Sequence, residues 1–118
     1  MDVSIMKSKA IVFTGPRQVE LVELEVKEPG PGELLLRTLV SQVSTGTELI
    51  CFRGECDPDT HWAEFMAPPL YPGYSAVGEV VAVGDGVSGF AVGDRLSSVH
   101  KHQQYATVPA DSICSHPL

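Results

Sequence analysis

The sequence predicts a mainly β fold of short strands and tight turns, and residues 72–96 carry most of that prediction. Val, Ala and Gly fall on both faces of residues 77–83, which indicates a strand inside a sheet. The Gly-Asp-Gly sequence at residues 84–86 tolerates positive φ and favours a tight turn. Glycines leave little room for a helix in this stretch, at positions 73, 78, 84, 86, 89 and 93.

Three more strands are expected before this stretch and two after it. Residues 9–13 form the first strand, and residues 18–26 the second, whose alternation from Val22 onward predicts one buried and one wet face. Residues 34–43 are apolar and β-branched enough for a largely buried third strand. Prolines and glycines at residues 28–33 predict a turn before it. Short strands are expected at 97–99 and 105–109.

Two short helices are expected between the third strand and residue 72. Residues 44–48 break the β periodicity, and a helix is predicted from Thr47 as its N-cap, ending at Gly54. Its inward face is predicted to be Leu49, Ile50 and Phe52. Residues 61–66 are expected to form the second helix.

Composition limits the partners and the compartment. The chain has 118 residues, enough for one domain. A formal net charge of −7 argues against a nucleic-acid or anionic-membrane partner, and no apolar run is long enough to span a membrane. The first residues lack the pattern of a signal peptide, and three cysteines are an odd number. A reduced, cytoplasmic setting is therefore expected.

Residues 84–89 match the dinucleotide-binding pattern G-x-G-x-x-G and follow a strand. That pattern binds a pyrophosphate when its third glycine opens a helix whose N–H groups face the ligand. Residues 90–94 are too short and too closely bounded by glycine for a helix. We therefore interpret residues 84–89 as a turn between strands, without a nucleotide.

Several spaced motifs together resemble one known family. They are P-G-P-G-E at 29–33 before L-L-L-R, G-T-E at 46–48, P-G at 72–73, V-G-D-R at 92–95, and Y-A-x-V-P-A at 105–110. The chain resembles the N-terminal, GroES-like domain of the medium-chain dehydrogenase/reductases, the zinc alcohol dehydrogenase superfamily, over residues 7–118. Residues 1–6 are left as an N-terminal extension.

The resemblance implies a partly open β-barrel with short helices that acts as the catalytic, substrate-side domain. Members of the family carry a second, Rossmann-type domain that binds NAD(P), and nothing in this sequence supplies it. We expect the chain to be part of a longer enzyme, inactive alone; the alternative is a stand-alone relic. The expected partners are that domain and a small carbonyl or alcohol substrate.

The sequence departs from the family pattern at the catalytic metal. Zinc-dependent members place a Cys two residues before the relay Ser or Thr, where this chain has Thr45. They read Gly-His-Glu where this chain has Gly73, Tyr74 and Ser75. The lobe for structural zinc is also missing, because residues 94–105 are too short for it. The chain is similar to a zinc-independent branch, the bacteriochlorophyllide-dehydrogenase-like subgroup, and no zinc is expected.

A second possible metal cluster is Cys51, Cys56 and His61, with His100 and His102 as extra donors. Zinc sites more often combine Cys residues two to four apart with a second pair of ligands. Cys51 on the inner face of a short helix also fits a small buried hydrophobe, and His61 fits a solvent-facing residue. We therefore predict no metal ligands in this chain.

The resemblance implies catalytic roles for Thr47, Tyr74 and His102, and cofactor contacts for Thr45 and Gly46. Thr47 matches the relay hydroxyl, which exchanges a hydrogen bond with a substrate oxygen; its alternative role is the helix N-cap. Tyr74 replaces the zinc-ligand His and offers a phenol to a carbonyl oxygen, or serves as a wall residue. His102 lies near the return to the cleft, or is a surface histidine.

Glu48 is expected to be structural and to fix its loop. If Thr47 and Tyr74 occupy the former metal positions, their side chains converge at the rim of one concave face. That face is unfinished without a second domain and could support a homodimer. The alternative function is a non-catalytic binding or assembly module on the same barrel, including a co-chaperonin-like ring. A heptamer in light scattering would favour that alternative.

Overall fold

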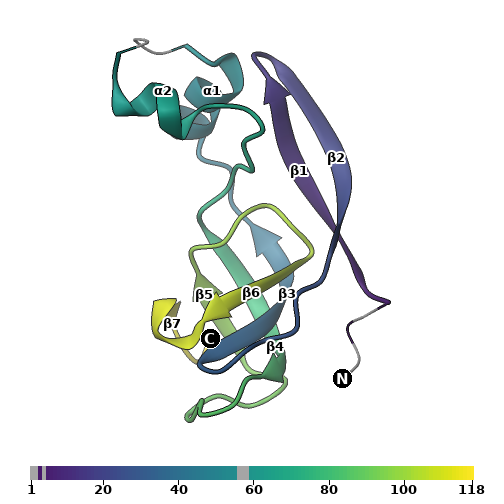
Figure 1. Cartoon of the computed structure of the whole chain (residues 1–118). Helices are drawn as coiled ribbons and strands as arrows, with labels where there is room; N and C mark the ends of the chain where they lie inside the picture. Colours follow the sequence, from purple (N-terminus) through teal and green to yellow (C-terminus); the bar gives the residue numbers. More distant parts are fainter. Residues whose placement is uncertain (1–2, 4, 56–58) are drawn as a thin grey trace.

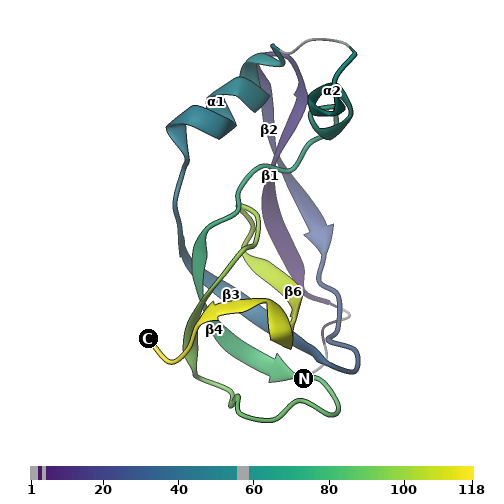
Figure 2. The same cartoon turned by 90° about the vertical axis from the view of Figure 1, so that its left-hand side faces the viewer.

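The protein consists of an antiparallel sheet and a separate β-ribbon, joined at one end to two short helices (Figure 1). The structure, a computed structural model, describes residues 3, 5–55 and 59–118. The ribbon pairs β1 (Lys7–Gly15) with β2 (Gln18–Glu25). A view turned by 90° shows α1 and α2 at the same end as the tip of the ribbon (Figure 2). The arrangement confirms the prediction of a mainly β fold, with the curled sheet of a partly open barrel.

The larger sheet has five strands in the order β6-β3-β4-β5-β7. Their bounds are β3 (Glu33–Ser41), β4 (Ala76–Val83), β5 (Arg95–Ser98), β6 (Tyr105–Pro109) and β7 (Ile113–Ser115). β4 lies between β3 and β5, as its two-sided apolar pattern predicted. β7 and the 3-10 turn Ala110–Ser112 were not predicted, because a three-residue strand has too little sequence for a pattern.

The core lies on both faces of the first half of β3. Leu34 and Leu36 pack with Val80, Leu96, Ala106 and Val108 on one face, while Leu35 packs with Val3 and Val26 on the other. The prediction of a largely buried strand over 34–43 is wrong for its second half, where Leu39, Val40 and Val43 are exposed. The reason is that β6 pairs with β3 only as far as Arg37.

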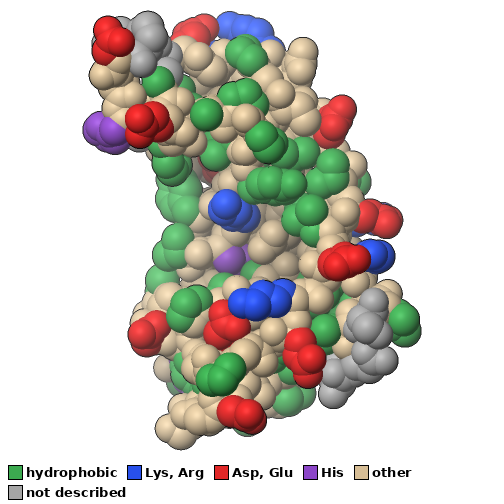
Figure 3. Space-filling model, viewed as in Figure 1, with side chains coloured by type: hydrophobic (Ala, Val, Ile, Leu, Met, Phe, Trp, Pro, Cys, Tyr) green, Lys and Arg blue, Asp and Glu red, His purple; other side chains and the backbone are tan. Residues whose placement is uncertain are grey.

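The ribbon has one wet face, as predicted from its alternation. Val22 and Leu24 are partly buried and Val26 is buried, whereas the side chains between them are exposed. Val19 and Leu21 are exposed, and hydrophobic side chains gather where the ribbon meets the helix end of the molecule (Figure 3). The ribbon therefore leaves apolar surface uncovered on this chain.

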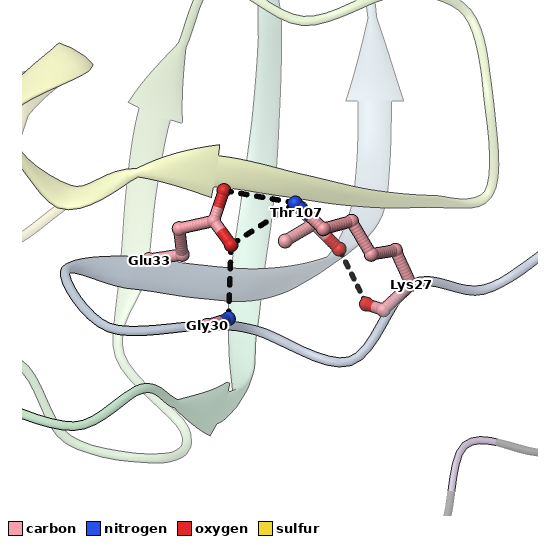
Figure 4. Close-up of polar contacts among 4 residues, drawn as sticks. All are labelled: Lys27, Gly30, Glu33 and Thr107. Carbon is pink, nitrogen blue, oxygen red and sulfur yellow. Dashed lines mark hydrogen bonds and ion pairs between the residues drawn. The ribbon is translucent and has the colours of Figure 1, made fainter.

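The P-G-P-G turn before β3 is held by Glu33 (Figure 4). Its carboxylate accepts the backbone N–H of Gly30 at 2.9 Å and the Lys27 ammonium at 3.2 and 3.3 Å. These two donors, the backbone N–H first, lower the pKa of Glu33. The Thr107 hydroxyl donates to the Lys27 carbonyl at 2.6 Å, which ties the turn to β6.

The glycines at residues 84–89 serve a turn, as predicted. No helix follows Gly89, and the chain runs through turns to β5. A Cβ on Gly84 would lie 2.0 Å from the Gly30 carbonyl oxygen, so the close approach of the two turns requires glycine there. Gly86 has a φ of 78°, a conformation that favours glycine.

The two helices are α1 (Thr45–Arg53) and α2 (His61–Phe65). Gly54 ends α1 in the left-handed conformation with a φ of 68°, as predicted. The predicted inward face was wrong for Leu49 and Ile50, which are exposed, while Glu48 is buried. Cys51 is buried as expected, and Phe52 is partly buried. In the described part of the chain, no helix is both long enough and apolar enough to cross a membrane.

Candidate functional site

Glu48 organises the first turn of α1. One carboxylate oxygen accepts the backbone N–H of Ser44, and the other contacts Nε2 of His102. Both side chains are buried, with 6% of Glu48 and 8% of His102 exposed. The buried pair explains which face of α1 turns inward, and it agrees with the expectation that Glu48 fixes this segment.

Thr47 is not the N-cap of α1. The helix begins at Thr45 and Ser44 occupies the N-cap position, so Thr47 lies inside the first turn. The sequence suggested a later start because Thr47 is itself a good capping residue. Glu48 binds the N–H of Ser44. The Thr47 hydroxyl is therefore not needed to cap the helix.

His102 is a buried residue, so its alternative assignment as a surface histidine is wrong. Its Nδ1 lies 2.7 Å from the Ser41 hydroxyl oxygen, and its backbone N–H donates to the Pro72 carbonyl. The His102 carbonyl accepts the N–H of Ile11 from β1. A Cβ on Gly73, whose φ is 109°, would lie 2.6 Å from the His102 backbone nitrogen. Two distant segments thus close over this histidine, which its local sequence does not reveal.

His100 is buried separately in the sheet. Its Nε2 lies 2.9 Å from the Thr38 hydroxyl oxygen, and its Nδ1 contacts the Ser98 hydroxyl. Burial, followed by the nearby His102, lowers the pKa of His100. A neutral imidazole between two hydroxyl groups is a satisfied core group and supplies no free metal donor.

Thr47 and Tyr74 line one cavity of about 210 Å³, as expected from their place in the family pattern. Thr47 comes from α1 and Tyr74 from the segment before β4, and 44% of Tyr74 is exposed. The other lining residues are mainly apolar: Glu48, Cys51, Phe65, Leu70, Tyr71, Pro72, Gly73 and Lys101. Two residues that carry hydroxyl groups therefore line a small, mostly apolar space that is open to solvent.

The remaining predicted residues lie around this cavity and do not line it. His102 is separated from it by Glu48 and lines a neighbouring apolar groove of about 300 Å³, together with Ile11, Phe13, Val19, Val43, Leu49, Phe52 and Pro72. Thr45 and Gly46 are exposed at the start of α1. A Cβ on Gly46 would meet no atom within 4 Å, so a ligand has room to approach the backbone there.

Lys101 is the lining residue that sequence reasoning missed. Its ammonium lies 5.7 Å from the centre of the Tyr71 ring, a cation–π contact. The available signal was the alternation between Val99 and His102, which turns Lys101 outward between two buried histidines.

The donor groups at the cavity do not fit a catalytic zinc. Glu48 and Cys51 are two potential ligands, fewer than the three that such a site uses. Glu48 is already engaged, and burial beside Glu48 raises the pKa of the Cys51 thiol. In the described ranges no three His, Cys, Asp or Glu side chains group as a metal site. The suggested ligand Cys56 lies outside those ranges, and His61 is exposed at the start of α2.

Comparison with known sequences agrees with the fold and the motifs. The family described as the alcohol dehydrogenase GroES-like domain matches residues 30–117. The chain is 37% identical over 91 residues to the 2-desacetyl-2-hydroxyethyl bacteriochlorophyllide A dehydrogenase of Cereibacter sphaeroides, covering 77% of this chain and 27% of that protein. It is 41% identical over 93 residues to the L-threonine 3-dehydrogenase of Pyrococcus furiosus, covering 77% of this chain and 25% of that protein. The chain thus matches only about a quarter of the length of these relatives.

Solved structures share the same architecture. A human synaptic vesicle membrane protein VAT-1 homolog-like protein superposes with a TM-score of 0.75 at 25% identity, over 95% of this chain and 36% of that one. An alcohol dehydrogenase from E. coli CFT073, complexed with NADH, superposes with a TM-score of 0.74 at 20% identity, over 94% and 39%. The chain therefore belongs to the alcohol dehydrogenase GroES-like domain family of the medium-chain dehydrogenase/reductases.

Proposed function

We propose that this chain, over residues 7–118, is the substrate-side domain of an NAD(P)-dependent, zinc-independent oxidoreductase in the cytoplasm. The observation that carries the proposal is the shared cavity of Thr47 and Tyr74, two hydroxyl-bearing residues among mostly apolar lining residues. The exposed free thiol of Cys114 is consistent with a reducing compartment. The small carbonyl or alcohol substrate and a separate Rossmann domain are the proposed partners.

The two hydroxyl groups bind the reacting oxygen of the substrate. When a carbonyl is reduced, negative charge develops on its oxygen, and hydrogen bonds from Thr47 and Tyr74 stabilise that charge in place of a metal ion. A bound substrate would displace water from the mostly apolar lining, which strengthens both hydrogen bonds. In the reverse direction, one of these oxygen atoms accepts the hydrogen bond of the alcohol O–H and the other donates to the alcohol oxygen. The alcohol proton would leave through the Thr47 hydroxyl to water, and it would return by the same route when a carbonyl is reduced.

His102 acts as a positioning residue in this proposal. Its contacts with Glu48 and Ser41 hold the first turn of α1 against the sheet, and that turn carries Thr47. Because Glu48 lies between His102 and the cavity, the imidazole affects the substrate through the position of α1.

The cofactor would approach the exposed start of α1. The nicotinamide supplies or accepts the hydride when it is bound, chemistry that belongs to the cofactor. Thr45 and Gly46 are the residues that would contact it, since both are exposed and the space beside Gly46 is open. The proposed Rossmann domain would hold the rest of the cofactor.

An NMR titration tests this function on the 118-residue chain. Acetophenone and 1-phenylethanol are added to labelled protein, and we expect backbone amide shifts around Thr47 and Tyr74. The variants Thr47→Val and Tyr74→Phe should weaken binding about threefold to tenfold, since each removes one hydrogen bond. The matched controls Thr14→Val and Tyr105→Phe, away from the cavity, should bind as the wild type does. Equal weakening in the controls, or no loss in the first two variants, contradicts the proposal.

A further inference from the structure

Lys101 places a positive charge on the wall of a cavity that is otherwise mostly apolar. It lines the same space as Thr47 and Tyr74, and its ammonium is held over the Tyr71 ring. A cation–π contact restrains the ammonium without neutralising its charge. The Lys101 ammonium has no role in the hydrogen bonds proposed for Thr47 and Tyr74.

Four of the eight lysine and arginine side chains of this chain are paired with carboxylates. Surface ion pairs join Lys7 to Glu25, Arg17 to Glu55, Lys27 to Glu33 and Arg37 to Glu79. Lys101 forms no ion pair within the described ranges, and neither do Lys9, Arg53 and Arg95, although the chain has a formal net charge of −7. Of these four cations, Lys101 is the one that lines the cavity of Thr47 and Tyr74. A cation left unpaired in an acidic chain is available to an anionic ligand.

The carboxylate of Glu48 is not the anionic partner of the Lys101 ammonium. It lines the cavity, but its two oxygens bind the Ser44 N–H and His102, and the side chain is buried. The residues that line the cavity therefore include Glu48 with its engaged carboxylate, Lys101 with an ammonium that forms no ion pair, and the hydroxyl-bearing Thr47 and Tyr74. Apolar side chains of Phe65, Leu70 and Pro72 supply the rest of the surface.

We propose that this cavity takes hydroxy acids or keto acids, with the substrate carboxylate bound to the Lys101 ammonium. This inference rests on the proposed function, which assigns the reacting oxygen to Thr47 and Tyr74. The ammonium is a compact charge with three donors, and it binds a carboxylate without the planar geometry that arginine requires. A hydrocarbon or aromatic group of the substrate packs against the apolar wall. The charge and the hydroxyl groups together select which end of the molecule reacts.

Calorimetry with two probes of the same shape tests the charge preference. Mandelate carries a carboxylate, an alcohol and an apolar ring, and mandelamide replaces the carboxylate with a neutral amide. We expect the 118-residue chain to bind mandelate about threefold to tenfold more tightly than mandelamide. Lys101→Gln should abolish this difference by weakening mandelate alone, and Lys101→Arg should restore most of it. Lys7→Gln, the same charge change on the ribbon, should leave both affinities unchanged.

The outcomes separate this inference from the proposed function. If Lys101→Gln binds mandelate as the wild type does, the carboxylate assignment is wrong. In that case a loss of mandelamide binding in Tyr74→Phe still supports the cavity as the substrate site. If neither probe binds the wild-type chain, both the inference and the site fail. Circular dichroism of each variant confirms that the fold is retained, which is expected because Lys101 is exposed.

Discussion

At the scale of single residues, the site depends on the buried carboxylate of Glu48, which has no proposed catalytic role. Glu48 joins the N-terminus of α1 to His102, a residue 54 positions away. The arrangement fixes the first turn of the helix from two directions. Thr47 lies in that turn and lines the cavity, so the contacts of Glu48 fix the position of the Thr47 backbone.

Replacing Glu48 by alanine should destabilise the protein by about 2–4 kcal/mol, because a buried imidazole nitrogen and the Ser44 N–H lose their partner. Urea unfolding measures the change in the free energy of unfolding. Glu20→Ala removes an exposed carboxylate from β2 and should change it by less than about 0.5 kcal/mol. Equal stability of the two variants would show that Glu48 does not hold α1.

His100 makes stability depend on pH. Because its pKa in the folded protein is below 6.5, the value of an unperturbed histidine, the unfolded chain takes up the proton first as the pH falls. The free energy of unfolding should therefore be fully retained above pH 6.5 and decrease below it, towards the folded pKa. His100→Gln keeps a donor and an acceptor near Ser98 and Thr38 but cannot titrate.

The measurement is the difference in unfolding free energy between wild type and His100→Gln across this range. Both proteins retain the titratable groups that are distant from His100, so the contributions of those groups cancel in the difference. The interaction of His100 with His102 remains part of the difference. We expect the wild type to lose more stability on acidification. Parallel pH curves would contradict the assignment of His100 as a buried neutral group.

At the scale of elements, close contacts between turns fix the end of the sheet. Gly84 lies against the Gly30 carbonyl, and its N–H donates to the Glu33 carbonyl at 2.8 Å. The turn before β3 and the turn after β4 thereby pack as one unit. Glycine is required at residue 84 by the space available to a side chain.

Gly84→Ala should destabilise the protein by about 1–3 kcal/mol, since the added methyl group must displace backbone atoms. Gly46→Ala, in the first turn of α1 with open space beside it, should be neutral or stabilising by up to about 1 kcal/mol. Thermal unfolding of both variants gives the comparison. A stable Gly84→Ala protein would mean that the two turns are not in contact in solution.

The strands with clear local patterns could be predicted from the sequence, and so could the turns between them. The alternation after Val22 and the glycine at residue 54 are local signals, and both were interpreted correctly. The exposed end of β3 was not predictable because it depends on where β6 stops pairing. Glu48 turns inward on α1 because it contacts the distant His102, so the local sequence of the helix could not reveal its burial.

Part of the candidate site was also predictable. Thr47 and Tyr74 occupy positions set by recognisable motifs, and they line the same cavity. The burial of His102 and the placement of Lys101 arise from contacts of residues 100–104 with β1 and with Pro72. Such contacts between separate segments leave only a weak alternation in the sequence.

At the scale of the whole molecule, exposed apolar surface lies near α1, the helix that contributes Thr47 to the cavity. The exposed apolar side chains near α1 are Val19, Leu21, Val43, Leu49 and Ile50. The curated relatives that the chain matches are about three times its length. This surface is therefore consistent with a domain that functions beside another one.

The purified protein should contain no zinc. The donors at the cavity are too few, and the positions of Thr45 and Tyr74 carry no metal-binding side chain. Elemental analysis after dialysis against a chelator measures the metal content. One zinc per chain that survives dialysis would contradict this prediction, and Cys51, Cys56 and His61 would be the first residues to replace.

A crystal structure of this chain with acetophenone bound tests most directly whether Thr47 and Tyr74 bind the reacting oxygen. We predict that the ketone oxygen lies about 3 Å from both the Thr47 hydroxyl oxygen and the Tyr74 phenol oxygen, with the ring against the apolar wall. A ketone bound in the neighbouring groove of Ile11, Val43 and Phe52, without contact to either hydroxyl group, would contradict it.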